Sequence, residues 1–167
     1  MSKPRRPLRR AIHGVLLLDK PKGVTSHQVL LTVRVLYNAD KAGHTGTLDP
    51  LATGLLPICF GHATKLTAHL LDARKRYVAE VKLGEASSTG DSEGEILARS
   101  NPAEASLAAL EAAAIAFTGT IQQVPPMYSA IKREGVRLYA LAREGVEVER
   151  EPRQVEIHAL RVIAFDG

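Results

Sequence analysis

The chain has 167 residues, of which 45% are hydrophobic and 4% aromatic, and it contains no tryptophan. This composition is typical of an ordinary globular domain with an aliphatic core, and it excludes a fully disordered or collagen-like chain. The single cysteine, Cys59, excludes a disulfide framework and a zinc site built from cysteines. No apolar run is long enough for a bilayer and no secretory signal is recognisable, so we expect a cytoplasmic protein that has no membrane partner.

The net charge of +4 originates in the first ten residues, which carry five Lys and Arg side chains and no acid. The other 157 residues therefore sum to −1. Because proline and serine separate the basic residues, we predict a disordered basic arm at 1–10 and a folded part at 11–167. Such an arm attracts phosphate backbones by counterion release, but it also suits a simple solubility tail, and the composition leaves both readings open.

Apolar runs and helical spacing predict two buried strands, two helices and a long loop in the first half of the chain. In chain order these are a strand at 14–18, a helix at 27–37, a loop at 38–53, a strand at 54–60 and a short helix near 64–72. Ser26 directly precedes the first helix, so we expect it to be the N-cap.

The second half is predicted to hold a half-exposed strand at 77–83, a solvent loop at 84–95, a helix from 101 to 119, an extended segment at 120–131, a short helix at 138–143 and a strand at 153–165. Asn101 is the expected N-cap of the long helix, and Glu104 is placed to close a capping box.

Strands and helices follow one another without regular alternation, which favours an α+β fold with a mixed, largely antiparallel sheet flanked by helices. The chain stops directly after the last predicted strand. Because that strand has no partner downstream, we expect the fold to be incomplete at its C-terminal end.

Residues 43–54 read Gly-His-Thr-Gly-Thr-Leu-Asp-Pro-Leu-Ala-Thr-Gly and lead directly into the predicted strand at 54–60. Pro50 disfavours helical backbone at Asp49, so the carboxylate is expected on extended backbone, close to the core and partly desolvated. A carboxylate in that position suits catalysis, but an Asx-turn or a loop cap is the common reason for Asp beside Gly and Pro.

The chain resembles the TruB family of bacterial tRNA pseudouridine synthases in six sequence motifs. These follow in family order at 14–23, 43–54, 63–65, 75–77, 123–132 and 135–145. The resemblance implies a pseudouridine synthase core and a uridine isomerase that flips the T-loop uridine of tRNA out of its stack. The enzyme then exchanges the N1–C1′ bond of that uridine for a C5–C1′ bond. It also implies the T-arm of tRNA as partner and no cofactor, because the product has the same atoms as the substrate.

The resemblance assigns roles by position. Asp49 matches the essential aspartate, which either attacks C1′ or acts as a base at C2′, and both routes remain open. Tyr77 matches the residue that stacks on the flipped uracil, although the first apolar residue of a strand also suits the core. His44 matches the residue that fills the gap in the RNA stack, whereas Lys20 and Lys65 either contact phosphate or support the loop.

The family continues past position 167 with a motif that supplies a second tyrosine against the uracil and an arginine beside the catalytic carboxylate. We therefore expect the 167-residue chain alone to be weakly active or inactive. Two other functions remain open, namely a non-catalytic tRNA-binding or folding module and a guide-dependent pseudouridylation subunit. We expect a monomer, and we expect no metal because the spacing of Cys59, His62 and His69 fits no common zinc pattern.

Overall fold

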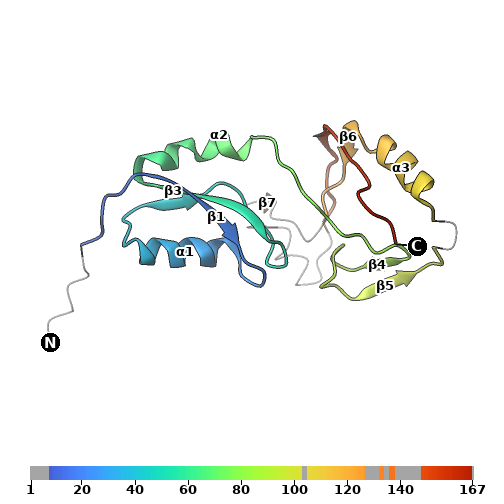
Figure 1. Ribbon diagram of the computed structural model, residues 1–167, viewed down its shortest axis with the longest axis horizontal. Helices are drawn as coiled ribbons and strands as arrows, with labels where there is room; N and C mark the ends of the chain where they lie inside the picture. The colour runs from blue at the N-terminus through green and yellow to red at the C-terminus, as the bar shows by residue number, and fades with distance from the viewer. Residues whose placement is uncertain (1–7, 103–104, 127–131, 134–135, 138–147, 167) are drawn as a thin grey trace. The chain divides into compact units, whose positions relative to one another are not determined.

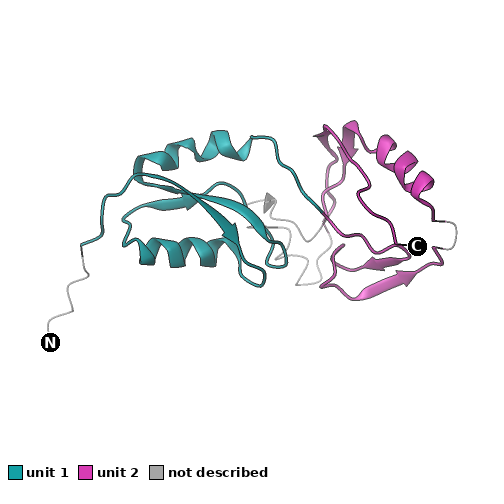
Figure 2. Cartoon of the chain, viewed as in Figure 1, with its two compact units in different colours: residues 1–78 teal, residues 79–167 magenta. Residues whose placement is uncertain are grey.

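The computed structural model describes residues 8–102, 105–126, 132–133, 136–137 and 148–166. The chain divides into two compact units, residues 1–78 and 79–167 (Figures 1 and 2). Each unit combines helical structure with antiparallel strand pairs, which confirms the predicted α+β class. Residues 1–7 lie outside the described residues, so the basic arm stays a prediction; Arg10 forms an isolated parallel bridge with Ala39.

The first unit is built on a three-stranded antiparallel sheet in the order β1-β3-β2. Strand β1 (Gly14–Lys20) pairs with β3 (Gly54–Phe60) over its whole length, and β2 (Ala42–His44) pairs with the far end of β3. The predicted loop at 38–53 therefore contains a strand. Three residues are too few to show a two-residue period, which explains why the sequence pattern missed it.

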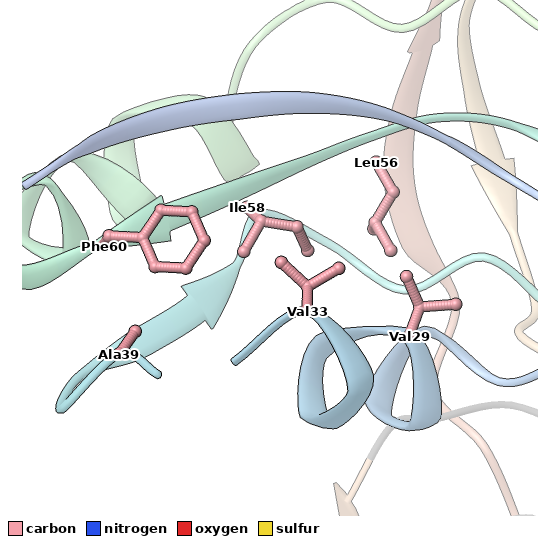
Figure 3. Packing of buried hydrophobic residues seen from close by; sticks show 6 residues of the cluster. All are labelled: Val29, Val33, Ala39, Leu56, Ile58 and Phe60. Carbon is pink, nitrogen blue, oxygen red and sulfur yellow. The ribbon is translucent and has the colours of Figure 1, made fainter. Parts of the chain in front are cut away.

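Helix α1 (Ser26–Leu36) packs on one face of this sheet and forms the core with β3 (Figure 3). Six buried side chains make up that core: Val29, Val33, Ala39, Leu56, Ile58 and Phe60. The expected N-cap was wrong by one residue. Thr25 caps the helix, because its hydroxyl accepts from the Gln28 N–H while the Gln28 side chain accepts from the Thr25 N–H.

The two predicted buried strands differ in how far they are covered. Strand β3 is buried through most of its second half, whereas Val15 and Leu17 of β1 are 46% and 68% exposed. Successive side chains of a strand point to opposite faces, so only Leu16 and Leu18 of β1 reach the core beside α1. The apolar run at 14–18 thus marked a strand correctly but overstated its burial.

The predicted helix near 64–72 is present as a 3₁₀ turn, η1 (Gly61–Leu66), followed by helix α2 (Thr67–Leu71). The predicted strand at 77–83 is wrong, because these residues form neither helix nor strand. An alternating apolar pattern is not sufficient for a β-strand, because a strand must also form hydrogen bonds with a neighbouring strand. Within the described part of the chain, nothing pairs with them.

Among its described residues, the second unit contains one helix and three strand pairs. Its elements are β4 (Glu85–Ser87), β5 (Ile96–Arg99), α3 (Leu107–Ala116), β6 (Gly119–Gln123), β7 (Lys132–Arg133), β8 (Val136–Arg137) and β9 (Arg153–Ile157). The pairs are β4 with β5, β6 with β9, and β7 with β8. The last predicted strand ends at Ile157 rather than at 165, and its partner is the upstream strand β6.

Helix α3 begins later than its sequence signals indicated. Ser106 is the N-cap, and its hydroxyl accepts from the Ala109 N–H at 3.2 Å, so Asn101 was the wrong residue. A serine directly before the apolar run competes better for the cap than an asparagine five residues away. Glu104 and the predicted helix at 138–143 lie outside the described residues. Of the described helices, none has the length and apolar character needed to cross a bilayer.

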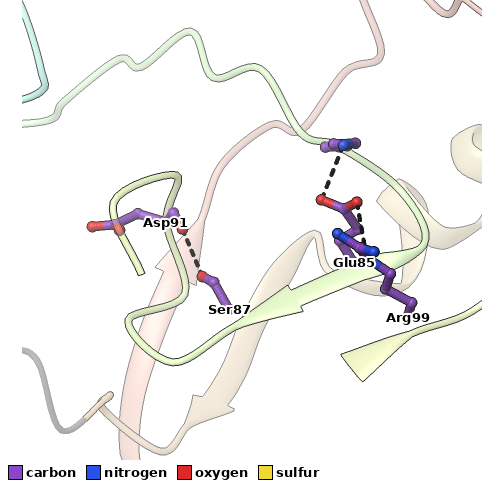
Figure 4. A network of polar contacts seen from close by, with 5 residues as sticks. Glu85, Ser87, Asp91 and Arg99 are labelled. Atoms are coloured by element: carbon purple, nitrogen blue, oxygen red, sulfur yellow. Dashed lines mark hydrogen bonds and ion pairs between the residues drawn. The ribbon is translucent and has the colours of Figure 1, made fainter. Parts of the chain in front are cut away.

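Polar contacts tie the β4–β5 hairpin together (Figure 4). Glu85 pairs with Lys82 at 3.0 Å and with Arg99 at 3.5 Å. In the connecting loop, the Thr89 hydroxyl donates to the Asp91 carboxylate at 2.5 Å, and the Glu93 N–H donates to the same oxygen at 2.9 Å. These hydrogen bonds, that of Thr89 above all, hold the pKa of Asp91 below its usual range.

The Asp91→Asn variant is expected to lose a small amount of stability at pH 7, and the loss is expected to shrink as the pH is lowered toward 2. A carboxylate whose pKa is lowered by folding stabilises the folded state above its unfolded pKa of about 4, and the contribution disappears as the pH falls through the lower folded value. Melting temperatures of both proteins between pH 7 and pH 2 measure this, with Glu95→Gln on the same hairpin as the control. A gap between the curves that is constant with pH would contradict the assignment.

Candidate functional site

The loop between β2 and β3 is fixed to the rest of the first unit on both sides of Asp49. Ser26, at the start of α1, makes the first attachment and is 1% exposed. Its hydroxyl donates to the Leu48 carbonyl at 3.1 Å and accepts from the Leu48 N–H at 2.9 Å. One buried hydroxyl therefore satisfies both backbone groups of the residue that precedes Asp49.

Lys20, at the end of β1, makes the second attachment and has no exposed surface. Its ammonium donates to the carbonyls of Pro21 at 3.0 Å, Val24 at 2.8 Å and Pro50 at 3.3 Å. The Gly23 N–H donates to the same Pro50 carbonyl at 2.7 Å. The three ammonium protons thus meet three backbone acceptors, one of them on the residue that follows Asp49.

The Lys20 side chain therefore has no exposed surface, and its ammonium bonds to the backbone of the Asp49 loop. We refer to the attachments made by Ser26, Lys20 and Gly23 to Leu48 and Pro50 as the backbone clamp.

The side chain of Asp49 is exposed, which corrects the expectation of a desolvated carboxylate beside the core. Leu48 packs against the core cluster, whereas the adjacent Asp49 is exposed. Its backbone carbonyl accepts from the Ala52 N–H at 3.1 Å, which adds a third fixed point to the loop. The clamp thus presents an outward-facing carboxylate on fixed backbone.

His44 closes strand β2 opposite Ile58 and is half-buried. Its Nδ1 atom is buried and has no hydrogen-bond partner among the described residues. A buried polar nitrogen without a hydrogen-bond partner costs free energy, so this ring is held at an energetic cost.

The other two candidates lie elsewhere in the first unit. Tyr77 is 71% exposed, on the segment after α2 that forms no regular structure, so it is not the core residue that a strand would have made of it. Lys65 is exposed on η1, which directly follows the end of β3 away from Asp49. The structure therefore joins Lys20 to the Asp49 loop and places Lys65 at the opposite end of the sheet.

Comparison with known proteins identifies relatives over nearly the whole chain. The model of the TruB family pseudouridylate synthase N-terminal domain matches residues 34–167. The tRNA pseudouridine synthase B of Neisseria meningitidis serogroup B is 56% identical over 162 residues, which cover 97% of this chain and 52% of the relative. The protein of the same name from Methylobacillus flagellatus is 58% identical over 160 residues, which cover 96% and 53%.

A solved structure shares the fold. The crystal structure of a Cbf5-Nop10-Gar1 complex matches 92% of this chain and 36% of the matched chain, with a TM-score of 0.60 and 28% sequence identity. The chain spans about half the length of the curated relatives it matches.

Proposed function

Because the chain belongs to the TruB family of pseudouridylate synthases, we propose that it carries the N-terminal domain of an enzyme that converts a uridine of tRNA to pseudouridine. Relatives named tRNA pseudouridine synthase B, more than half identical across the chain, support the substrate class. The observation that carries the proposal is the exposed carboxylate of Asp49 on backbone fixed by the clamp. The target is the T-loop uridine in the T-arm.

The proposed reaction is an isomerisation. The N1–C1′ bond breaks, the uracil turns, C5 joins C1′, the C5 proton leaves and N1 gains a proton. Nothing is oxidised and no group is consumed, so the chemistry asks for no cofactor. Asp49 serves either as the nucleophile at C1′ or as the base at C2′, and both roles require a carboxylate held at a fixed point. The clamp supplies that point through hydrogen bonds from the Lys20 and Ser26 side chains to the main chain of Leu48 and Pro50.

Two further side chains complete the proposed site. The exposed ring of Tyr77 stacks on the extruded uracil, since every base offers a face to an aromatic ring. His44, which is half-buried at the end of β2, occupies the space that the base leaves in the RNA stack. The enzyme acts on free tRNA as a monomer, without a guide RNA or partner proteins.

A tritium-release assay tests this function, because the reaction breaks the C5–H bond. A T-arm hairpin that carries 5-³H uridine at the target position is incubated with the complete gene product and, separately, with the 167-residue chain. We expect stoichiometric release from the former and little or none from the latter. A hairpin with labelled uridine only in its stem is the control. Binding without release would favour the non-catalytic module, and release only with added partner proteins would favour a guide-dependent subunit.

A further inference from the structure

The chain that leaves α2 toward Tyr77 is fastened to the end of that helix by the side chain of Lys75. The Lys75 ammonium donates to the backbone carbonyl of Leu71, the last residue of α2, and to the carbonyl of Ala73 at 3.0 Å. The last carbonyls of a helix have no N–H partner within the helix, and a lysine placed just beyond the helix can supply one. Lys75 therefore caps α2 and folds the outgoing chain back onto it.

The main chain alone holds this turn weakly. Two backbone hydrogen bonds close it, from the N–H groups of Asp72 and Ala73, and both are 3.4 Å long. That exceeds the usual length of about 3.0 Å, so each bond is weak. Within the described part of the chain, no hydrogen bond or ion pair reaches residues 76–78. Lys75 is thus the last fixed point before Tyr77.

Leu71 connects the same turn to the loop that carries Asp49. A Cβ atom added to Gly46, three residues before Asp49, would lie 3.8 Å from Leu71 Cδ2, which is an ordinary van der Waals distance. The Leu71 side chain therefore lies against the Gly46 backbone. The residue whose side chain contacts the Asp49 loop is also the residue whose carbonyl binds Lys75.

The proposed reaction requires a fixed separation between Asp49 and Tyr77. The carboxylate reacts at the ribose and the ring stacks on the base of the same nucleotide, and a misplacement of about 1 Å can cost about 100-fold in rate. The clamp fixes Asp49. Tyr77 is 71% exposed and belongs to no helix or strand, so its position has to be set from elsewhere.

We propose that Lys75 is a positioning residue, which sets the place of the Tyr77 ring relative to Asp49 by fastening the exit of α2 to Leu71. The inference rests on the proposed function, because it takes Asp49 and Tyr77 as the two groups that meet one nucleotide. Two of the three ammonium donors of Lys75 are used by backbone carbonyls. Lys75 therefore acts on the rate through Tyr77 and not by a contact with the RNA.

Single-turnover tritium release by the complete gene product on the T-arm hairpin tests the proposal. Lys75→Met is expected to release tritium about five- to ten-fold more slowly, with hairpin affinity within about two-fold of wild type. Lys75→Arg should restore the rate to within about two-fold, because a guanidinium also donates to carbonyls. Arg74→Met removes the neighbouring exposed charge and should keep the wild-type rate. Equal rates in Lys75→Met and Arg74→Met would overturn the proposal.

A double-mutant cycle with Tyr77→Ala separates positioning from a general structural role. If Lys75 acts through the Tyr77 ring, Lys75→Met should change the rate of the Tyr77→Ala protein by less than about two-fold, although it slows wild type. An equal loss in both backgrounds would show that Lys75 supports the fold or the chemistry independently of Tyr77, and the proposal would fail.

The salt dependence of hairpin affinity distinguishes positioning from a phosphate contact. Lys75→Met and Arg74→Met each remove one exposed positive charge from the same turn, so both variants should show the same salt slope. A slope lower by about one in Lys75→Met alone would identify a phosphate bound by Lys75 and would overturn the assignment.

Tritium release by wild type separates this inference from the proposed function. Without release from the wild-type gene product, the proposed function fails and the role of Lys75 fails with it. Normal release from wild type together with normal release from Lys75→Met leaves the proposed function standing and removes only the inference.

Discussion

Replacing Asp49 with asparagine reduces tritium release by the complete gene product at least about 1,000-fold under single-turnover conditions. Asparagine keeps the size of the side chain and its outward position on the clamped loop, but it neither attacks C1′ nor accepts a proton at C2′. Hairpin affinity should stay within about two-fold of wild type, since no binding contact has been assigned to the carboxylate.

The control for this prediction is Asp72→Asn, which removes an exposed carboxylate at the end of α2 and should leave the rate unchanged. A normal rate in Asp49→Asn would remove Asp49 from the chemistry, and the clamp would then have to be explained as an element of stability only. A lost rate with equally lost affinity would instead indicate that the carboxylate organises the loop.

Replacing Lys20 with methionine is expected to lower the free energy of unfolding by about 2–4 kcal/mol and the reaction rate at least about ten-fold. Methionine fills a similar volume, but it leaves the carbonyls of Val24 and Pro50 without their ammonium donor in a buried position. The Pro50 carbonyl keeps only the Gly23 N–H, so the backbone after Asp49 loses part of its support.

Chemical denaturation measures the loss of stability, and single-turnover tritium release measures the rate on the fraction that is folded. Lys22→Met is the matched control, because Lys22 belongs to the same turn and is exposed. Equal stability of Lys20→Met and Lys22→Met would contradict the structural role. A Lys20→Met protein that is destabilised but fully active when folded would show that the Ser26 side of the clamp suffices to hold Asp49.

The sequence predicted those helices and strands whose pattern lies within the segment itself. The strands at β1 and β3 and the first helix follow from apolar runs and helical spacing, and the structure confirms them. Strand β2 and the missing strand at 77–83 show the limit. Whether a segment becomes a strand depends on a neighbour distant in the chain, and a short or unpaired segment gives no periodic sign of that neighbour.

The sequence named candidate site residues, but it did not predict how the structure holds them. The motif at 43–54 singled out Asp49. The motif at 14–23 made Lys20 a candidate, but it did not show that the Lys20 side chain is buried. Thr25 and Ser26 are adjacent hydroxyl residues of which only one can cap α1, so the other had to bond elsewhere. Its partner, Leu48, lies 22 residues away, a separation that no local pattern reports.

The clamp holds the Asp49 loop by the main-chain atoms of its residues, so it constrains few of the loop's side chains. Ser26, Gly23 and Lys20 bond the N–H and carbonyl of position 48 and the carbonyl of position 50, which every amino acid except proline offers at position 48 and every amino acid offers at position 50. As far as the grip is concerned, the side chains on either side of the carboxylate are interchangeable, while the gripping hydroxyl and ammonium are not. Positions 48 and 50 can therefore change their side chains without moving the Asp49 carboxylate. They flank Asp49, the position that tolerates substitution least.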